Sequence, residues 1–243
     1  MPYLMLVRAP ETPDSEVEEP TQPEPTEPTA LSEPTEAEDT EPVSWLEFAG
    51  DRWITGERLR PSQDATCVRV REGKTLISHG PFVEVGEQIA GFDLLAVETE
   101  EEAVAIAAAH PVAQIGALEL RELRMLEGDL DPWTGAPIDY VMLMAREAAT
   151  PAEEFDDDGW LDRWLALDVS RGGAPTAPPA EAVTVRVRDG QTLVTRGPFA
   201  ELQEYVDGYD LIQAPDLDTA IAAAATHPSA RLGVIEIRPV WPF

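Results

Sequence analysis

The chain has 243 residues, which fits one large domain or two small ones. Its 17 basic and 47 acidic residues leave a formal charge of −30, which disfavours nucleic acid as a partner because phosphates would be repelled. No stretch approaches the roughly 20 apolar residues that a membrane span needs, and the first residues do not resemble a signal peptide, so we expect a cytoplasmic protein without membrane association. One cysteine and three histidines predict neither an internal disulfide nor a Cys/His metal cluster, and no cofactor motif is found.

An acidic segment follows the first apolar residues. Residues 11–42 contain twelve Asp or Glu residues, seven prolines and no Lys or Arg. Such a composition buries too little apolar surface to offset the entropy of ordering the chain. We therefore predict a disordered, extended insert, whose natural partner would be a basic protein surface.

An internal repeat organises the rest of the chain. Residues 68–82 match residues 185–199 at an offset of 117, and the match continues through the later parts of both segments. Residues 3–6 resemble residues 140–143, where the acidic insert accounts for the different offset. Two copies of one unit are therefore predicted. Their bounds are 1–10 plus 43–124 for the first unit, 125–137 for the linker and 138–243 for the second unit.

Each unit is predicted to follow the order β-α-β-β-β-α-β. Alternating apolar residues predict strands, and Asp189-Gly190 favours a two-residue type I′ turn in the hairpin of the second unit. Thr99 and Glu102 are spaced as a capping box at the start of the second helix of the first unit. In chain order, the elements expected are a strand at 3–8 or 140–146, a helix near 45–48 or 160–165, a hairpin about 72–73 or 189–190, a strand at 91–97 or 208–214, a helix ending before Pro111 or Pro228, and a strand at 115–120 or 232–237.

These residues resemble a known family. The Val-Arg-Val-Arg hairpin, Gly-Pro-Phe at 80–82 and 197–199, and the glycine-aromatic pairs beginning at Gly91 and Gly208 are similar to the YCII-related, or DGPF-domain, family. Arg-Pro-Val at 238–240 completes the match. The resemblance implies an α+β fold of ferredoxin-like units that pair as a dimeric α/β barrel. Because most members are single units, this chain resembles such a dimer fused into one polypeptide.

The family motif begins with aspartate, and this chain departs from it twice. His79 and Arg196 occupy the aspartate positions, at the end of an apolar hairpin face and just before Gly-Pro-Phe. One reading makes this strand end the mouth of a pocket, with His79 as a catalytic acid or base and Arg196, Phe82 and Phe199 as ligand-binding residues. The other reading makes His79 and Arg196 strand-end residues that pair with nearby carboxylates.

Asp93 and Asp210 form a second candidate pair, because each interrupts an otherwise apolar strand at the same place in its unit. They are candidate general bases whose pKa burial would raise, and pseudo-twofold symmetry would let them face a shared cleft. The alternative is a structural carboxylate that is hydrogen-bonded to an arginine of a neighbouring strand, such as Arg69, Arg71, Arg186 or Arg188.

His110 and His227 stand at the ends of predicted helices, directly before prolines. Histidine at this position can satisfy terminal carbonyl groups and interact favourably with the helix dipole, and that structural reading is preferred to catalysis.

The sequence supports two alternative hypotheses about function. In the first, a small organic molecule binds between the two units, with cofactor-free acid/base chemistry; the resemblance implies this, because some family members act on small organic or aromatic compounds. In the second, the protein is a non-catalytic regulatory or interaction module that uses the acidic arm. The sequence leaves open whether the protein is an enzyme.

Overall fold

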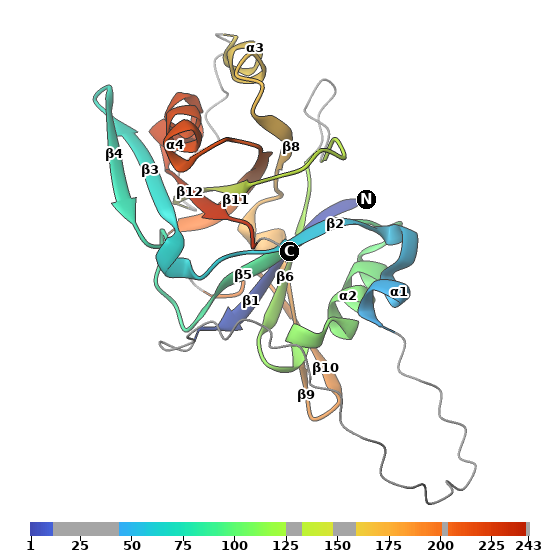
Figure 1. Ribbon diagram of the computed structural model, residues 1–243. Helices are drawn as coiled ribbons and strands as arrows, with labels where there is room; N and C mark the ends of the chain where they lie inside the picture. The colour runs from blue at the N-terminus through green and yellow to red at the C-terminus, as the bar shows by residue number, and fades with distance from the viewer. Residues whose placement is uncertain (12–43, 125–132, 148–158, 201–203, 242–243) are drawn as a thin grey trace, which may run out of the picture.

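The computed structural model describes residues 1–11, 44–124, 133–147, 159–200 and 204–241 (Figure 1). The predicted disordered insert, apart from Glu11, and most of the predicted linker lie outside these ranges. No helix among the described residues is both long enough and apolar enough to cross a membrane.

The described residues form a mixed α+β structure, in which two antiparallel sheets are accompanied by a few short helices. The strands and helices of the first unit are β1 (Pro2–Pro10), α1 (Trp45–Ala49), β2 (Trp53–Arg58), β3 (Thr66–Arg71), β4 (Lys74–His79), β5 (Glu87–Ala96), α2 (Glu100–Ala109) and β6 (Ala117–Glu122). Those of the second unit are β7 (Tyr140–Glu147), α3 (Trp160–Leu165), β8 (Ser170–Pro175), β9 (Val183–Arg188), β10 (Gln191–Arg196), β11 (Glu204–Ile212), α4 (Leu217–Thr226), α5 (Ser229–Leu232) and β12 (Val234–Pro239).

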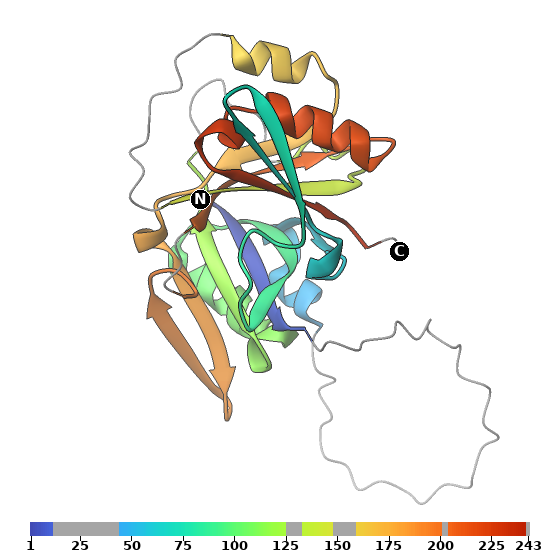
Figure 2. The same cartoon turned by 90° about the vertical axis from the view of Figure 1, so that its left-hand side faces the viewer.

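Each sheet combines four strands of one unit with a hairpin of the other. The strand orders are β10-β9-β6-β1-β5-β2 and β4-β3-β12-β7-β11-β8. Leu118 of β6 lies opposite Val185 of β9, and Ile235 of β12 lies opposite Val68 of β3. Figure 2 shows the β9–β10 hairpin, in orange, beside the green β6, and the teal β3–β4 hairpin on the side of α4. The two units have therefore exchanged hairpins, which ties them together through backbone hydrogen bonds.

The central strands separate two kinds of core because their side chains alternate between faces. Leu4 of β1 and Val141 of β7 belong to one apolar cluster, so one face of each sheet packs against the other sheet. Met5, on the opposite face of β1, packs with Ile106 of α2, and Met142 of β7 packs in the corresponding cluster of the second unit. Helices therefore cover the outer face of each sheet.

The hairpin predictions are confirmed. Thr66 lies opposite His79, and Val183 lies opposite Arg196. Asp189 and Gly190 have φ of 51° and 72°, the left-handed values that a type I′ turn requires at both central positions. Helix α2 begins at the predicted place, where the Thr99 side chain accepts a hydrogen bond of 3.3 Å from the Glu102 backbone N–H.

The predicted element order omits one strand in each unit. Strand β2 pairs with β5, and β8 pairs with β11, so each unit contributes six strands rather than five. Both missed strands contain glycine, and the β8 sequence Ser-Arg-Gly-Gly-Ala-Pro has no apolar alternation. Tertiary pairing forms these strands where the local sequence favours a loop.

Candidate functional site

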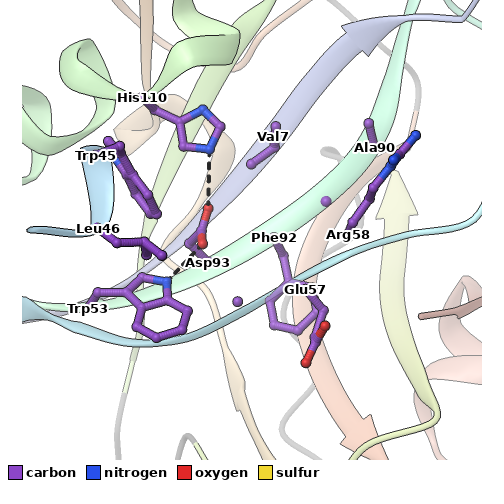
Figure 3. Close-up of a pocket in the computed structure, with 12 residues that line it drawn as sticks. Val7, Trp45, Leu46, Trp53, Glu57, Arg58, Ala90, Phe92, Asp93 and His110 are labelled. Carbon is purple, nitrogen blue, oxygen red and sulfur yellow. Dashed lines mark hydrogen bonds and ion pairs between the residues drawn. The ribbon is translucent and has the colours of Figure 1, made fainter. Parts of the chain in front are cut away.

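A pocket of about 270 Å³ lies in the first unit, on the helix-covered face of its sheet. Asp93 points into it from β5, on the same face as Met5, which it opposes across the ladder. His110 enters from the end of α2, Trp45 from the start of α1 and Trp53 from the start of β2. Figure 3 shows the Asp93 carboxylate between the His110 ring and the Trp53 indole.

The Asp93 carboxylate has two defined neighbours. The Trp53 indole N–H donates a hydrogen bond of 2.9 Å to Asp93 Oδ1. His110 Nε2 lies 4.0 Å from Asp93 Oδ2, which is too long for a direct hydrogen bond. The carboxylate is therefore held at one oxygen, while the other oxygen faces the imidazole across a short gap.

A glycine in the neighbouring strand makes room for this carboxylate. Gly56 of β2 lies opposite Asp93 of β5. A Cβ atom at Gly56 would overlap Asp93 Oδ1 and would come within 2.8 Å of the Phe92 carbonyl oxygen. The absence of a side chain at Gly56 thus leaves space for the Asp93 carboxylate over the adjacent strand.

The surroundings of His110 determine which of its ring nitrogens carries the hydrogen. Its Nδ1 accepts a hydrogen bond of 3.1 Å from the Val112 backbone N–H, so this nitrogen carries no hydrogen. The neutral ring then bears its hydrogen on Nε2, which faces Asp93. Trp45 fixes the ring from the side through an edge-to-face contact, with 4.6 Å between ring centroids.

Burial disfavours the charged form of both groups. It raises the pKa of Asp93 to about 7, against the opposing effect of the Trp53 hydrogen bond. It also lowers the pKa of His110 to about 4. Near neutral pH, Asp93 is thus divided between acid and carboxylate, whereas His110 is an uncharged donor.

The second unit repeats this arrangement in a pocket of about 260 Å³. His227 Nε2 lies 3.6 Å from Asp210 Oδ2, and His227 Nδ1 accepts a hydrogen bond of 3.2 Å from the Ser229 backbone N–H. Burial raises the pKa of Asp210 well above its usual value and lowers that of His227 to about 4. Gly173 makes room for Asp210 as Gly56 does for Asp93.

The two pockets differ at their edges. Ser170 stands where the first unit has Trp53, since each precedes the glycine by three residues and pairs with the equivalent strand. An ion pair between Arg146 and Asp207 lines the second pocket, and burial raises the pKa of Asp207 to about 6. Ala90 takes the place of Asp207 in the first pocket.

A known family matches the sequence over nearly the whole length of the chain. The model of the YCII-related domain matches residues 3–127 and 143–243. The chain belongs to the YCII-related domain family. The two matched regions also confirm the tandem arrangement of two YCII-related units.

One curated relative is an uncharacterized protein, R00369, from Rhizobium meliloti (strain 1021). It is 36% identical over 69 residues, which are 28% of this chain and 56% of the relative. The chain thus spans little more than half the length of this relative.

The prediction that Asp93 and Asp210 face a shared cleft between the YCII-related units is wrong. Asp93 and Asp210 lie on the helix-covered faces of their sheets, whereas the sheets meet through their opposite faces. Residues of the first unit line one pocket, and residues of the second unit line the other. The two carboxylates therefore belong to separate sites.

Among the described residues, no arginine forms an ion pair with Asp93 or Asp210, whose charged neighbours are His110 and His227. Arg69 pairs with Glu204 at 3.1 Å, and Arg186 pairs with Glu87 at 2.8 Å. These arginines instead link the exchanged hairpins to the opposite unit, while Asp93 faces Trp53 and His110.

The hairpin-end candidates lie outside both pockets. His79 is exposed at the end of β4. Arg196 is also exposed, and its guanidinium pairs with Glu100 at 2.7 Å. This ion pair matches the alternative reading of Arg196, while a catalytic role for His79 stays a prediction.

The Gly-Pro-Phe segments of both YCII-related units lie against the opposite unit. The Phe82 backbone N–H donates a hydrogen bond of 2.8 Å to the Glu236 carboxylate. The Phe199 ring lies under the Arg8 guanidinium, 4.7 Å from it, and Arg8 pairs with the buried Glu119 at 2.9 Å. These contacts anchor the exchanged hairpins; neither phenylalanine lines a described pocket.

The two histidines take a different role from the predicted one. Instead of satisfying terminal carbonyls, their Nδ1 atoms accept backbone N–H groups and their Nε2 atoms face the aspartates, a role that the sequence did not predict. A usable signal was present: each histidine follows its aspartate by 17 residues in both units. Within the described residues, no group of three His, Cys, Asp or Glu side chains could hold a metal ion.

Proposed function

We propose that each YCII-related unit binds a small organic molecule in its own pocket and transfers a proton there without a cofactor. The observation that carries this proposal is the repeated pairing of a buried carboxyl with an uncharged imidazole, at 4.0 Å in one unit and 3.6 Å in the other. Both pairs stand in the wall of a pocket. Buried acids with raised pKa values are frequent in acid/base sites.

The two groups have different roles in this chemistry. The carboxylate form of Asp93 accepts a proton from a substrate carbon or hydroxyl group. The Nε2–H of His110 donates a hydrogen bond to the substrate oxygen on which negative charge develops. The acid form of Asp93 then returns the proton at another substrate atom, so the net change is an isomerisation and both side chains recover their starting state.

The pKa values of Asp93 and His110 suit this transfer of a proton to and from the substrate. A general base works best when its pKa lies near the ambient pH, because the reactive form is then available and the proton transfer is nearly balanced. The pKa of Asp93, at about 7, meets this condition. An uncharged His110 can donate a hydrogen bond without competing for the proton.

We further propose that the fused pair corresponds to a dimer of single units of the dimeric α/β barrel type. The exchanged hairpins and the sheet-to-sheet core support this correspondence. Duplication within one chain lets the two pockets diverge, as the difference between Trp53 and Ser170 illustrates.

Replacing the aspartates tests the chemistry directly. A panel of small cyclic carbonyl compounds is incubated with the protein in D₂O, and proton NMR follows deuterium incorporation next to the carbonyl group. We expect catalysed exchange with the wild type, a reduction of about 100-fold in the Asp93→Asn/Asp210→Asn double variant, and partial loss in each single variant.

His79→Gln is the comparison variant, because it removes the histidine that lies outside both pockets. Its exchange rate should equal that of the wild type. Exchange that persists in the double variant, or that is lost in His79→Gln, would contradict the assignment of the chemistry to the Asp–His pairs.

A further inference from the structure

The two pockets differ in charge at one equivalent position. Arg58, at the end of β2, lines the first pocket, and Pro175 of β8 lines the second at the same place in the repeat. Arg58 lies opposite Gly91, and Pro175 lies opposite Gly208. At this position the first pocket thus has a cation where the second has an apolar ring.

Arg58 shares the pocket face with the acid/base pair. Strand side chains alternate, so Arg58 lies on the same side of β2 as Gly56, which opposes Asp93. Two residues along a strand correspond to about 7 Å. Figure 3 shows Arg58 at one end of the pocket and the Asp93–His110 pair at the other.

No carboxylate of the described residues forms an ion pair with Arg58. The neighbouring Glu57 also lines the pocket, but its carboxylate points away from the Asp93–His110 pair (Figure 3). In the second pocket, by contrast, the Arg146 guanidinium is neutralised by Asp207. The first pocket therefore offers a guanidinium that has no salt-bridge partner among the described residues, although the carboxyl groups of Asp93 and Glu57 line the same pocket.

The second unit holds Arg58 in place. The Trp241 backbone N–H donates a hydrogen bond of 2.7 Å to the Arg58 carbonyl oxygen. The Arg58 guanidinium lies over the Trp241 ring, 4.8 Å from its centroid, in a cation–π contact. Stacking on one face leaves the in-plane N–H donors of the guanidinium free for a planar anion.

We infer that the first pocket takes a small molecule that bears a carboxylate, which Arg58 binds while the rest of the molecule reaches Asp93 and His110. This inference rests on the proposed small-molecule site and adds the chemical class of its ligand. The volume of about 270 Å³ and the spacing of about 7 Å suit a compound of one ring. The second pocket, with Pro175 and a neutralised arginine, takes an uncharged molecule.

Matched probes test the charge preference. 4-Fluorobenzoate and 4-fluorobenzamide share their ring and differ in charge, and fluorine NMR measures the binding of each. The Trp53 indole N–H signal, assigned with Trp53→Phe, reports occupancy of the first pocket. We expect the benzoate to bind about 10-fold more tightly than the benzamide and to shift the Trp53 signal.

Arg58→Gln should abolish this preference while leaving benzamide binding unchanged. Arg60→Gln is the matched control: Arg60 also stacks near Trp241, at 6.0 Å, but it pairs with Asp64 and does not line the pocket. The control should keep the full preference despite the same change in net charge.

The outcomes separate the two proposals. Equal binding of both probes, or an unchanged preference in Arg58→Gln, would overturn the carboxylate assignment and leave the small-molecule site intact. If neither probe shifts the Trp53 signal, the carboxylate assignment fails. The proposed acid/base function is contradicted only if, in addition, the wild type shows no catalysed deuterium exchange.

Discussion

Replacing Gly173 by alanine should lower the free energy of unfolding by about 3 kcal/mol, with a similar loss for Gly56→Ala. A Cβ atom at Gly173 would overlap Asp210 Oδ1 and would come within 2.8 Å of the Tyr209 carbonyl oxygen. The backbone cannot yield easily, because Gly173 pairs with Asp210 in the sheet. Chemical denaturation followed by circular dichroism measures the change.

Gly86→Ala is the matched control for this substitution. A Cβ atom at Gly86 would meet no atom within 4 Å, and its φ does not lie in the left-handed region. Its effect on stability should stay within about 0.5 kcal/mol. If all three variants lost the same amount, the close approach of the carboxylates to the glycines would not explain the result.

Asp93→Asn should stabilise the protein at alkaline pH and do little at acid pH. Because burial raises the pKa of Asp93 from 3.8 to about 7, folding costs free energy wherever the unfolded chain is ionised and the folded carboxyl resists ionisation. The wild type therefore loses stability as pH rises from about 4 to 7. At pH 8 the variant should be more stable by about 2–3 kcal/mol, and at pH 3.5 the two should be nearly equal.

His110→Gln supplies the opposite control. Burial lowers the pKa of His110 from 6.5 to about 4, so the wild type loses stability as pH falls through this range. This variant should be the more stable one, by about 2 kcal/mol, at pH 4.5 and should gain nothing at pH 8. Denaturation curves with the same pH dependence for both variants would contradict the burial of the pair.

The repeat in the sequence was enough to predict most of the fold. The turn at Asp189-Gly190, the cap at Thr99 and the pairing of Thr66 with His79 are local features, which short-range rules determine. The exchange of hairpins is different, because Val68 has the same apolar character whichever strand it joins. The choice between β6 and β12 depends on the packing of the whole chain.

The candidate site was predicted in part. Asp93 and Asp210 were identified because a carboxyl in an apolar strand is costly unless it is used. Their partners, His110 and His227, come from helix ends that local rules explain sufficiently by capping. The shared spacing of 17 residues was their one signal in the sequence, and only the fold shows that it brings them to the aspartates. Arg58 was missed with its strand, since β2 is formed by pairing with β5.

An NMR titration of the Trp53 indole N–H tests the central claim most directly. This N–H donates to Asp93 Oδ1, so its chemical shift follows the ionisation of that carboxyl. A buried Asp–His pair predicts a titration with a pKa of about 7 that disappears in Asp93→Asn. A titration completed below pH 5, as for an ordinary aspartate, would contradict the account of Asp93 as a proton carrier at neutral pH.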